Sequence, residues 1–171
     1  MEVLDAIRTR RSIRSFTGEP ISDEDAIKIL DAARLAPSGG NRQNWIFVYV
    51  KDTQTLRILK NCSPGFYGDA SSAIVICAPE GVRTVGLLDV GFACENIVLA
   101  AHSLGIGSCP IASFSKEPVK KLIQVPQGHE PVLVVSLGYP DVVPHSPNKK
   151  PLGEIVFLNS FGKKWDKLGG I

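Results

Sequence analysis

The segment VGLLDVGFACENIVLAAHSL, residues 85–104, is the longest stretch of the chain with a helical repeat. Apolar or small side chains occupy most of its circumference, so a helix here must be buried, either in the core or against another subunit. The chain has 171 residues, which suits one compact domain. In a domain of this size we expect part of the helix to form a subunit interface, with Gly105 as its left-handed C-cap.

Short apolar runs on both sides of this segment predict strands that are covered on both faces. These runs are residues 45–50, 72–77 and 132–137, and residues 155–158 could add a final strand. The remaining pattern predicts helices over residues 2–9, 23–36, 53–61 and 116–124. We expect Ser22 and Thr53 to act as N-caps. Three or four covered strands interleaved with helices imply a helix–sheet–helix sandwich.

Composition and charge exclude several classes of protein. Hydrophobic residues make up 44% of the chain and charged residues 21%, which is ordinary for a globular protein. No apolar run approaches the roughly 20 residues that a bilayer requires, and the charged, amphipathic start does not resemble a secretory signal. We therefore expect a cytoplasmic protein that does not bind membranes. A net charge of +2 gives no general attraction to nucleic acid.

Several common catalytic and metal-binding patterns are missing from the sequence. The four cysteines form no Cys-x-x-Cys pair, so a zinc ribbon or a thioredoxin-type redox pair is unsupported. The histidines, His102, His129 and His145, are scattered, and none lies near a candidate nucleophile in the sequence. Residues 105–110 begin like a dinucleotide-binding fingerprint, but they follow a helix instead of a strand, so a Rossmann fold is not indicated. We expect no metal site.

A cluster of arginines lies just after the first predicted helix. The motif RRSIR, residues 10–14, places three guanidiniums and a hydroxyl within five residues. Guanidinium groups suit phosphate because they donate two parallel, charged hydrogen bonds. On an extended segment Arg10, Ser12 and Arg14 point to one side and Arg11 to the other. The cluster favours a local pocket for a small anion, and a solvated basic turn also fits these residue types.

A glycine-containing connection precedes the first predicted strand. Two adjacent glycines in PSGGNRQNW, residues 37–45, would let the backbone approach a ligand closely. Ser38, Asn41 and Gln43 add hydrogen-bond donors and acceptors. An ordinary helix-to-strand connection is an equally good interpretation of this segment.

Taken in order, these segments resemble the FMN-dependent nitroreductase family over most of the chain. The motif at 10–14 matches the family's opening Arg-x-Ser-x-basic pattern, and residues 36–45 are similar to its Pro-Ser-x-x-Asn-x-Gln-Pro-Trp. Further similarities are Asp69-Ala70-Ser71, the helix with Asp89, Ala93 and Asn96, Pro110-Ile111, Leu137-Gly138-Tyr139-Pro140 and Lys149-Lys150-Pro151-Leu152. These motifs, in the right order and at compatible spacings, make the resemblance specific.

The resemblance implies an α+β fold with a mixed, mainly antiparallel sheet, in which residues 1–171 form a single FMN-binding domain. It implies a homodimer with two flavin sites at the subunit interface, and an extended tail from about residue 141 to 171 that packs on the partner subunit. It also implies that NADH or NADPH reduces the FMN. The electrons then pass to a nitroaromatic, a quinone or a similar small acceptor in ping-pong fashion.

The resemblance further implies which residues bind the cofactor. They are Arg10, Arg11, Ser12, Arg14, Pro37, Ser38, Gly39, Asn41, Pro110, Ile111, Ala112, Lys149 and Lys150. Arg10 and Ser12 would hold the phosphate and ribityl chain, one of the two lysines would close on the phosphate, and Arg14 would face the pyrimidine edge. Residues 37–41 would come from the partner subunit, and residues 110–112 would lie along the isoalloxazine with backbone near its N5 atom. The flavin carries the electron chemistry, so no catalytic side chain is required.

The sequence also departs from the family pattern. Asn44 replaces the usual proline before Trp45, Ser63 and Phe66 stand where many relatives contact the flavin pyrimidine, and Ala112 stands where some place an acid. A large substrate-covering insertion is missing, which predicts a more open site. Two alternatives therefore stay open: a flavin-binding redox carrier or sensor without substantial turnover, and a flavin-free anion-binding or scaffold protein.

Overall fold

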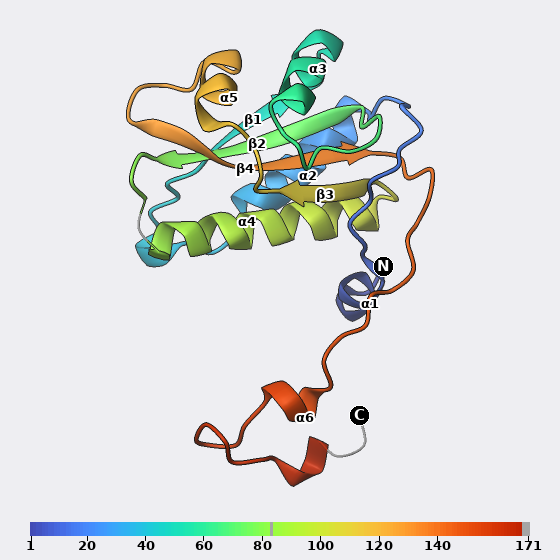
Figure 1. The fold of residues 1–171 in the computed structure, drawn as a ribbon, viewed down its shortest axis with the longest axis vertical. Coiled ribbons are helices and arrows are strands. Elements are labelled where there is room, and N and C mark those ends of the chain that lie inside the picture. The colour runs from blue at the N-terminus through green and yellow to red at the C-terminus, as the bar shows by residue number, and fades with distance from the viewer. Residues whose placement is uncertain (83, 169–171) are drawn as a thin grey trace.

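Four strands form the central sheet in the computed structural model, which describes residues 1–82 and 84–168 (Figure 1). They are β1 (Ile46–Val50), β2 (Ser72–Pro79), β3 (Gly107–Ile111) and β4 (His129–Gly138), in the spatial order β1-β2-β4-β3. Each pair of neighbouring strands is antiparallel. The sheet is thus more uniformly antiparallel than expected, and its one parallel contact among the described residues is an isolated bridge between Ser12 and Ser108.

Helices cover both faces of this sheet, as the predicted helix–sheet–helix sandwich requires (Figure 1). On one face lie α2 (Asp23–Arg34) and α4 (Thr84–Ser103), and on the other lie α3 (Thr53–Asn61) and α5 (Lys116–Leu122). Alternate residues of a strand point to opposite faces. Accordingly, Ile74 packs in the core beneath α2 and α4, whereas its neighbour Val75 packs with Leu59 and Val119 beneath α3 and α5.

Helix α4 confirms the helix predicted from the long apolar segment. Its side chains lie in two different environments. Ile97 and Ala101 are completely buried against the sheet. On the opposite side Leu87, Leu88 and Phe92 are 47%, 55% and 47% exposed. A helix that is apolar almost all round is usually covered on every side, and an exposed apolar patch often marks an interaction surface. The exposed side of α4 is therefore the surface that we expect a second subunit to cover.

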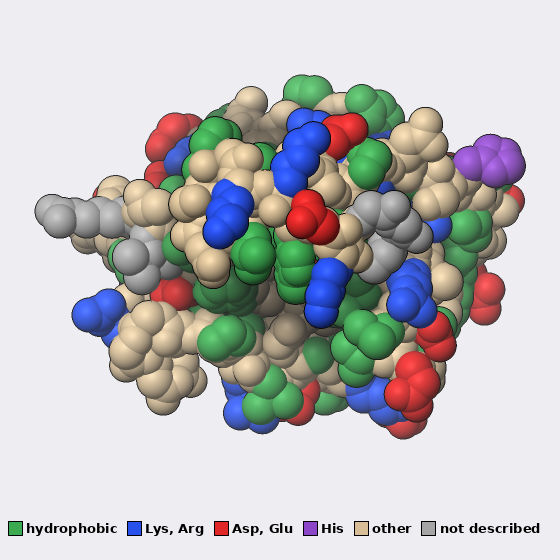
Figure 2. Space-filling model, turned by 90° about the horizontal axis from the view of Figure 1, so that it is seen from below, with side chains coloured by type: hydrophobic (Ala, Val, Ile, Leu, Met, Phe, Trp, Pro, Cys, Tyr) green, Lys and Arg blue, Asp and Glu red, His purple; other side chains and the backbone are tan. Residues whose placement is uncertain are grey.

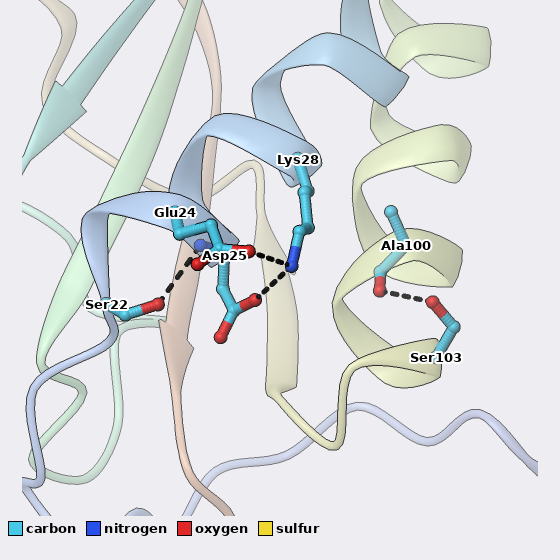
Figure 3. Close-up of polar contacts among 6 residues, drawn as sticks. All are labelled: Ser22, Glu24, Asp25, Lys28, Ala100 and Ser103. Carbon is cyan, nitrogen blue, oxygen red and sulfur yellow. Dashed lines mark hydrogen bonds and ion pairs between the residues drawn. The ribbon is translucent and has the colours of Figure 1, made fainter.

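Local capping explains where two of the helices begin. The hydroxyl of Ser22 accepts a hydrogen bond from the Asp25 N–H at 3.1 Å, as expected, and Lys28 pairs with Glu24 and Asp25 one turn later (Figure 3). The predicted cap of α3 is wrong by one residue. Asp52, in extended conformation, accepts from the Thr55 N–H at 2.8 Å, because its carboxylate reaches the free amides before Thr53 can.

Three strands differ from expectation. Strand β3 was not predicted, because it contains glycine and proline, which are uncommon in strands. It forms by pairing with β4. Residues 155–158 do not add a strand to the sheet, since Leu152–Ile155 forms the short helix α6 and Phe157 makes one isolated bridge to Lys164. Strand β1 is only partly covered, because it lies at the sheet edge.

The two ends of the chain leave the body of the molecule on the same side. Helix α1 (Val3–Thr9) exposes Val3, Leu4 and Ile7, and the tail beyond Pro140 runs past it to α6 (Figure 1). The tail is extended over residues 141–151, as its prolines predict. Viewed from the tail, hydrophobic side chains lie among lysines and arginines (Figure 2). Within the described residues, no helix has the length and apolar character needed to cross a membrane.

Candidate functional site

The basic segment, defined here as residues 10–14, runs in extended conformation from the end of α1 along the outer edge of β3. The Ile13 N–H donates to the carbonyl of Ser108 at 2.9 Å. Gly107 permits this close approach, because a Cβ there would lie 2.8 Å from Cγ1 of Ile13. Ile13 is buried, whereas Ser12 and Arg14 on either side of it stay accessible. The backbone thus presents the polar side chains of the basic segment outward from a fixed edge.

The basic segment and the start of the tail enclose a cavity of about 720 Å³. Small-molecule and cofactor sites span roughly 300–1,000 Å³, so this cavity can hold a ligand larger than a free phosphate. Its charged and polar lining residues are Arg8, Arg10, Arg11, Ser12, Arg14, Glu95, His145, Ser146 and Lys149. Cations outnumber the acid in this lining, so we call it the basic cavity, and its charge suits an anionic ligand.

Neighbouring thiols show where two of the guanidiniums lie. Burial raises the pKa of Cys94 on α4 to about 12, with a further contribution from Glu95, and Arg10 opposes this rise. Burial also raises the pKa of Cys109 on β3, and there Arg14 opposes it. The charge of Arg10 therefore acts on α4 and the charge of Arg14 acts on β3.

Arg11 has a different environment from Arg10 and Arg14. Its guanidinium folds back and donates to the backbone carbonyls of Arg8 at 2.8 Å and of Arg10 at 2.7 Å. These bonds stabilise the turn between α1 and the basic segment. Arg11 also lines a second cavity of about 230 Å³ beside His102 and Met1. Arg11 thus lines both cavities, and it is not separated from Arg10 as the alternation of an extended segment predicted.

The glycine loop, defined here as residues 37–43, is held by side chains. Buried Asp89 of α4 accepts a hydrogen bond from the Gly39 N–H at 3.0 Å. The Ser38 hydroxyl accepts from the Gln43 N–H, also at 3.0 Å. Asn41 and Gln43 adopt left-handed φ values of 53° and 50°, which are uncommon for residues with a side chain. Conformational strain of this kind often accompanies a binding role.

The two predicted halves of the site do not meet within one chain. Asp89, which anchors the glycine loop, and His102, which contacts the basic segment through Thr9, are 13 residues apart on α4. At a rise of 1.5 Å per residue this separation is about 20 Å along the helix axis. None of residues 37–43 lines the basic cavity.

Other predicted site residues fall into two groups. Lys149 lines the basic cavity, whereas Lys150 is exposed outside its lining. Pro110 and Ala112 are exposed near the end of β3, but the side chain of Ile111 is 3% exposed and packs in the core with Phe66 and Val119. Ile111 can therefore offer a ligand only its backbone.

Sequence reasoning did not assign a role to Asp89, His102, Glu95 or His145. Asp89 and Glu95 are acids on a mostly apolar helix, and that contrast could have marked them. The two histidines gave no comparable signal, because their contacts involve residues distant in the chain. Within residues 1–82 and 84–168, no group of histidine, cysteine and acidic side chains could hold a metal ion.

Comparisons with known proteins show the family of this chain. The model of the Nitroreductase family matches residues 7–64 and 58–139. A protein of Archaeoglobus fulgidus, named as an NADH dehydrogenase/NAD(P)H nitroreductase, is 43% identical over an alignment of 152 residues that covers 81% of this chain and 86% of the relative.

Solved structures show the same fold. An FMN-dependent nitroreductase of Clostridium difficile has a TM-score of 0.83 and 30% identity, with 92% of this chain and 99% of that chain covered. The NADPH:FMN oxidoreductase of Vibrio harveyi has a TM-score of 0.85 and 25% identity, with 97% and 80% covered. The family model covers most of the chain, and the relative from Archaeoglobus fulgidus is 43% identical to it: this chain belongs to the nitroreductase family.

Proposed function

We propose that this protein is a cytoplasmic NAD(P)H-dependent FMN oxidoreductase that acts on a small acceptor. The observation that carries the proposal is the basic cavity, where Arg10, Ser12 and Lys149 meet around a volume suited to a cofactor. The names of the related proteins, which include FMN reductase [NAD(P)H] and NADPH-flavin oxidoreductase, support the same cofactor and reductant.

The residues present fit FMN. A phosphate carries nearly two negative charges, and Arg10, Lys149 and the hydroxyl of Ser12 supply charged and neutral donors for it. Arg14, near β3, would meet the polar pyrimidine edge of the ring system. Its positive charge there would favour the more negative, reduced form of the cofactor. Pro110 and Ala112, exposed near the end of β3, would lie beside the ring, with the backbone of Ile111 between them.

The active form in this proposal is a homodimer that packs through the exposed side of α4 and the tail. Two antiparallel copies of α4 would place the glycine loop of one subunit near the basic segment of the other. This arrangement would join the glycine loop and the basic segment, which do not line a common cavity within one chain. The apolar side chains of Leu88, Phe92 and the tail residue Trp165 would then be covered.

The cofactor supplies the electron chemistry when it is bound, taking electrons from NADH or NADPH and passing them to the acceptor. The chain's part is to bind and orient it and to leave one ring face accessible. Because a covering insertion is missing, we propose that nicotinamide and acceptor use this face alternately. Nitroaromatics and quinones are flat and electron-poor, and they fit such a face.

Anaerobic titration of the FMN-loaded protein tests this function. We expect the flavin absorbance to bleach on addition of NADH or NADPH and to return on addition of a quinone or a nitroaromatic compound. A protein that binds FMN but is not reduced by either nicotinamide would instead be a flavin carrier or sensor. A protein that refuses FMN altogether would contradict the proposal.

A further inference from the structure

His102, in the last turn of α4, links this helix to the start of the basic segment. Its Nε2 lies 2.8 Å from the hydroxyl oxygen of Thr9. The hydroxyl already donates its own hydrogen to the carbonyl of Asp5 at 2.6 Å, so it can only accept from His102. Nε2 therefore carries the hydrogen. Thr9 directly precedes Arg10, so this bond fixes the point at which the basic segment begins.

His102 stands in a positive environment. Burial lowers its pKa, and the guanidiniums of Arg10 and Arg11 lower it further. It lines the 230 Å³ cavity together with Arg11 and Met1. Glu95 of the same helix and His145 of the tail line the neighbouring basic cavity. His102 does not line the basic cavity, so it can influence a ligand there only through its neighbours.

We propose that His102 is a positioning residue for the basic segment and that it takes up one proton when a phosphate-bearing ligand binds there. The inference rests on the proposed function, because FMN would be that ligand. Bound phosphate offsets the positive potential of Arg10 and Arg11 at the imidazole. Nδ1 then binds a proton from solvent, while the Nε2 hydrogen stays bonded to Thr9 in both states. No other bond forms or breaks.

The sign of the effect follows from linkage. In the ligand-free protein the pKa of His102 lies below its ordinary value of 6.5, and a bound phosphate raises it. Phosphate affinity therefore increases as pH falls through the interval between these two pKa values. The folding stability of the ligand-free protein changes with pH in the opposite direction. A histidine whose pKa is lower when folded than when unfolded reduces stability as pH falls below the unfolded value.

A pair of substitutions separates the charge of His102 from its hydrogen bond. His102→Gln keeps an N–H for Thr9 but cannot be protonated, and His102→Leu removes both. Each is placed in a His145→Gln background, so that His145 does not contribute to the pH dependence. FMN affinity is measured by fluorescence quenching from about pH 5 to pH 8, with riboflavin, which lacks the phosphate, as the matched ligand. Circular dichroism of each ligand-free variant checks the fold.

The inference predicts that His102→Gln binds FMN as the His145→Gln parent does at pH 8 and more weakly as pH falls. A tenfold difference at low pH corresponds to a pKa shift of one unit in His102. The riboflavin affinity of His102→Gln should equal that of the parent. His102→Leu should bind FMN more weakly than the parent at every pH. Equal pH dependence in His102→Gln and its parent overturns the proton uptake, and normal FMN binding by His102→Leu at pH 8 overturns the positioning role. If no variant, including the parent, binds FMN, the proposed function itself fails.

Discussion

The basic segment and the glycine loop are both expected to touch the cofactor, and they are held in place by different interactions. The basic segment is part of the body of the fold. Its backbone bonds to β3 through Ile13, the side chain of Ile13 is buried, and Gly107 permits this close approach. The glycine loop lies on the surface, contains left-handed residues, and depends on the carboxylate of Asp89.

This contrast indicates different contributions to binding. A segment fixed by the sheet is organised before a ligand arrives, so its charges lose little entropy on binding. A strained surface loop gains its support only from a few side-chain contacts and, in our proposal, from the second subunit. We therefore expect changes in the basic segment to have the larger effect on cofactor affinity.

The largest expected effect is that of Arg10→Ala combined with Arg14→Ala. Each charged hydrogen bond contributes about 1.5–3 kcal/mol, so FMN affinity should fall by roughly 100-fold or more. The fold should be retained, because both side chains are accessible and have no ion pair among the described residues. Equilibrium titration measures the affinity. The double variant Arg34→Ala, Arg57→Ala removes the same charge elsewhere and should bind FMN normally; equal loss in both would show a nonspecific charge effect.

The next effect concerns the backbone of the glycine loop at Asn41. Proline cannot adopt the left-handed φ of 53° there and would also remove the N–H that bonds to the Ser38 carbonyl. We expect Asn41→Pro to reduce FMN affinity by about tenfold. Glycine adopts this conformation without strain, so Asn41→Gly should retain affinity. Loss in both variants would mean that the Asn41 side chain, rather than the loop backbone, is important.

Gly107→Ala tests whether the basic segment is fixed by close packing. The added Cβ would lie within about 3 Å of Ile13, so the segment or β3 must shift. Overpacking of this kind costs about 1–3 kcal/mol, which denaturant unfolding would measure. Gly153→Ala has open space around its Cβ and should change stability little. An unchanged free energy of unfolding for Gly107→Ala would show that the segment moves freely.

The smallest expected effect is that of Asp89→Ala, which removes the anchor of the glycine loop. Loss of the bond to the Gly39 N–H should cost about 1 kcal/mol and speed hydrogen exchange in residues 37–43. Asp89→Asn keeps an oxygen acceptor and should protect the loop more than alanine does. Unchanged exchange in Asp89→Ala would mean that other contacts hold the loop.

Sequence periodicity predicted most of the fold because the buried elements have simple patterns. The continuous apolar run of β2 and the mostly apolar stretch of α4 are unambiguous, and both lie where we expected them. Strand β3 could not be predicted in the same way, because Gly107 and Pro110 have low strand propensity. These residues form a strand because they pair with β4. The strand expected at 155–158 was wrong because an apolar run without a neighbouring strand has no partner to pair with.

The candidate site was predictable where residue type alone carries the chemistry. Arginines beside a serine indicate phosphate binding, and their place around one cavity agrees with it. The roles of Asp89 and His102 were not predictable, because each depends on a contact with a residue 50 or 93 positions away. The inward packing of Ile111 depends likewise on its strand register with β4.

A mixed dimer tests whether each site combines the basic segment of one subunit with the glycine loop of the other. One subunit carries Arg10→Ala and Arg14→Ala, and its differently tagged partner carries Asn41→Pro. If the site is shared, one of the two sites in the purified heterodimer has both segments intact, and the heterodimer binds one FMN with the affinity of the unmodified protein. If the heterodimer binds FMN no better than either defective homodimer, each site belongs to a single chain and the account is wrong.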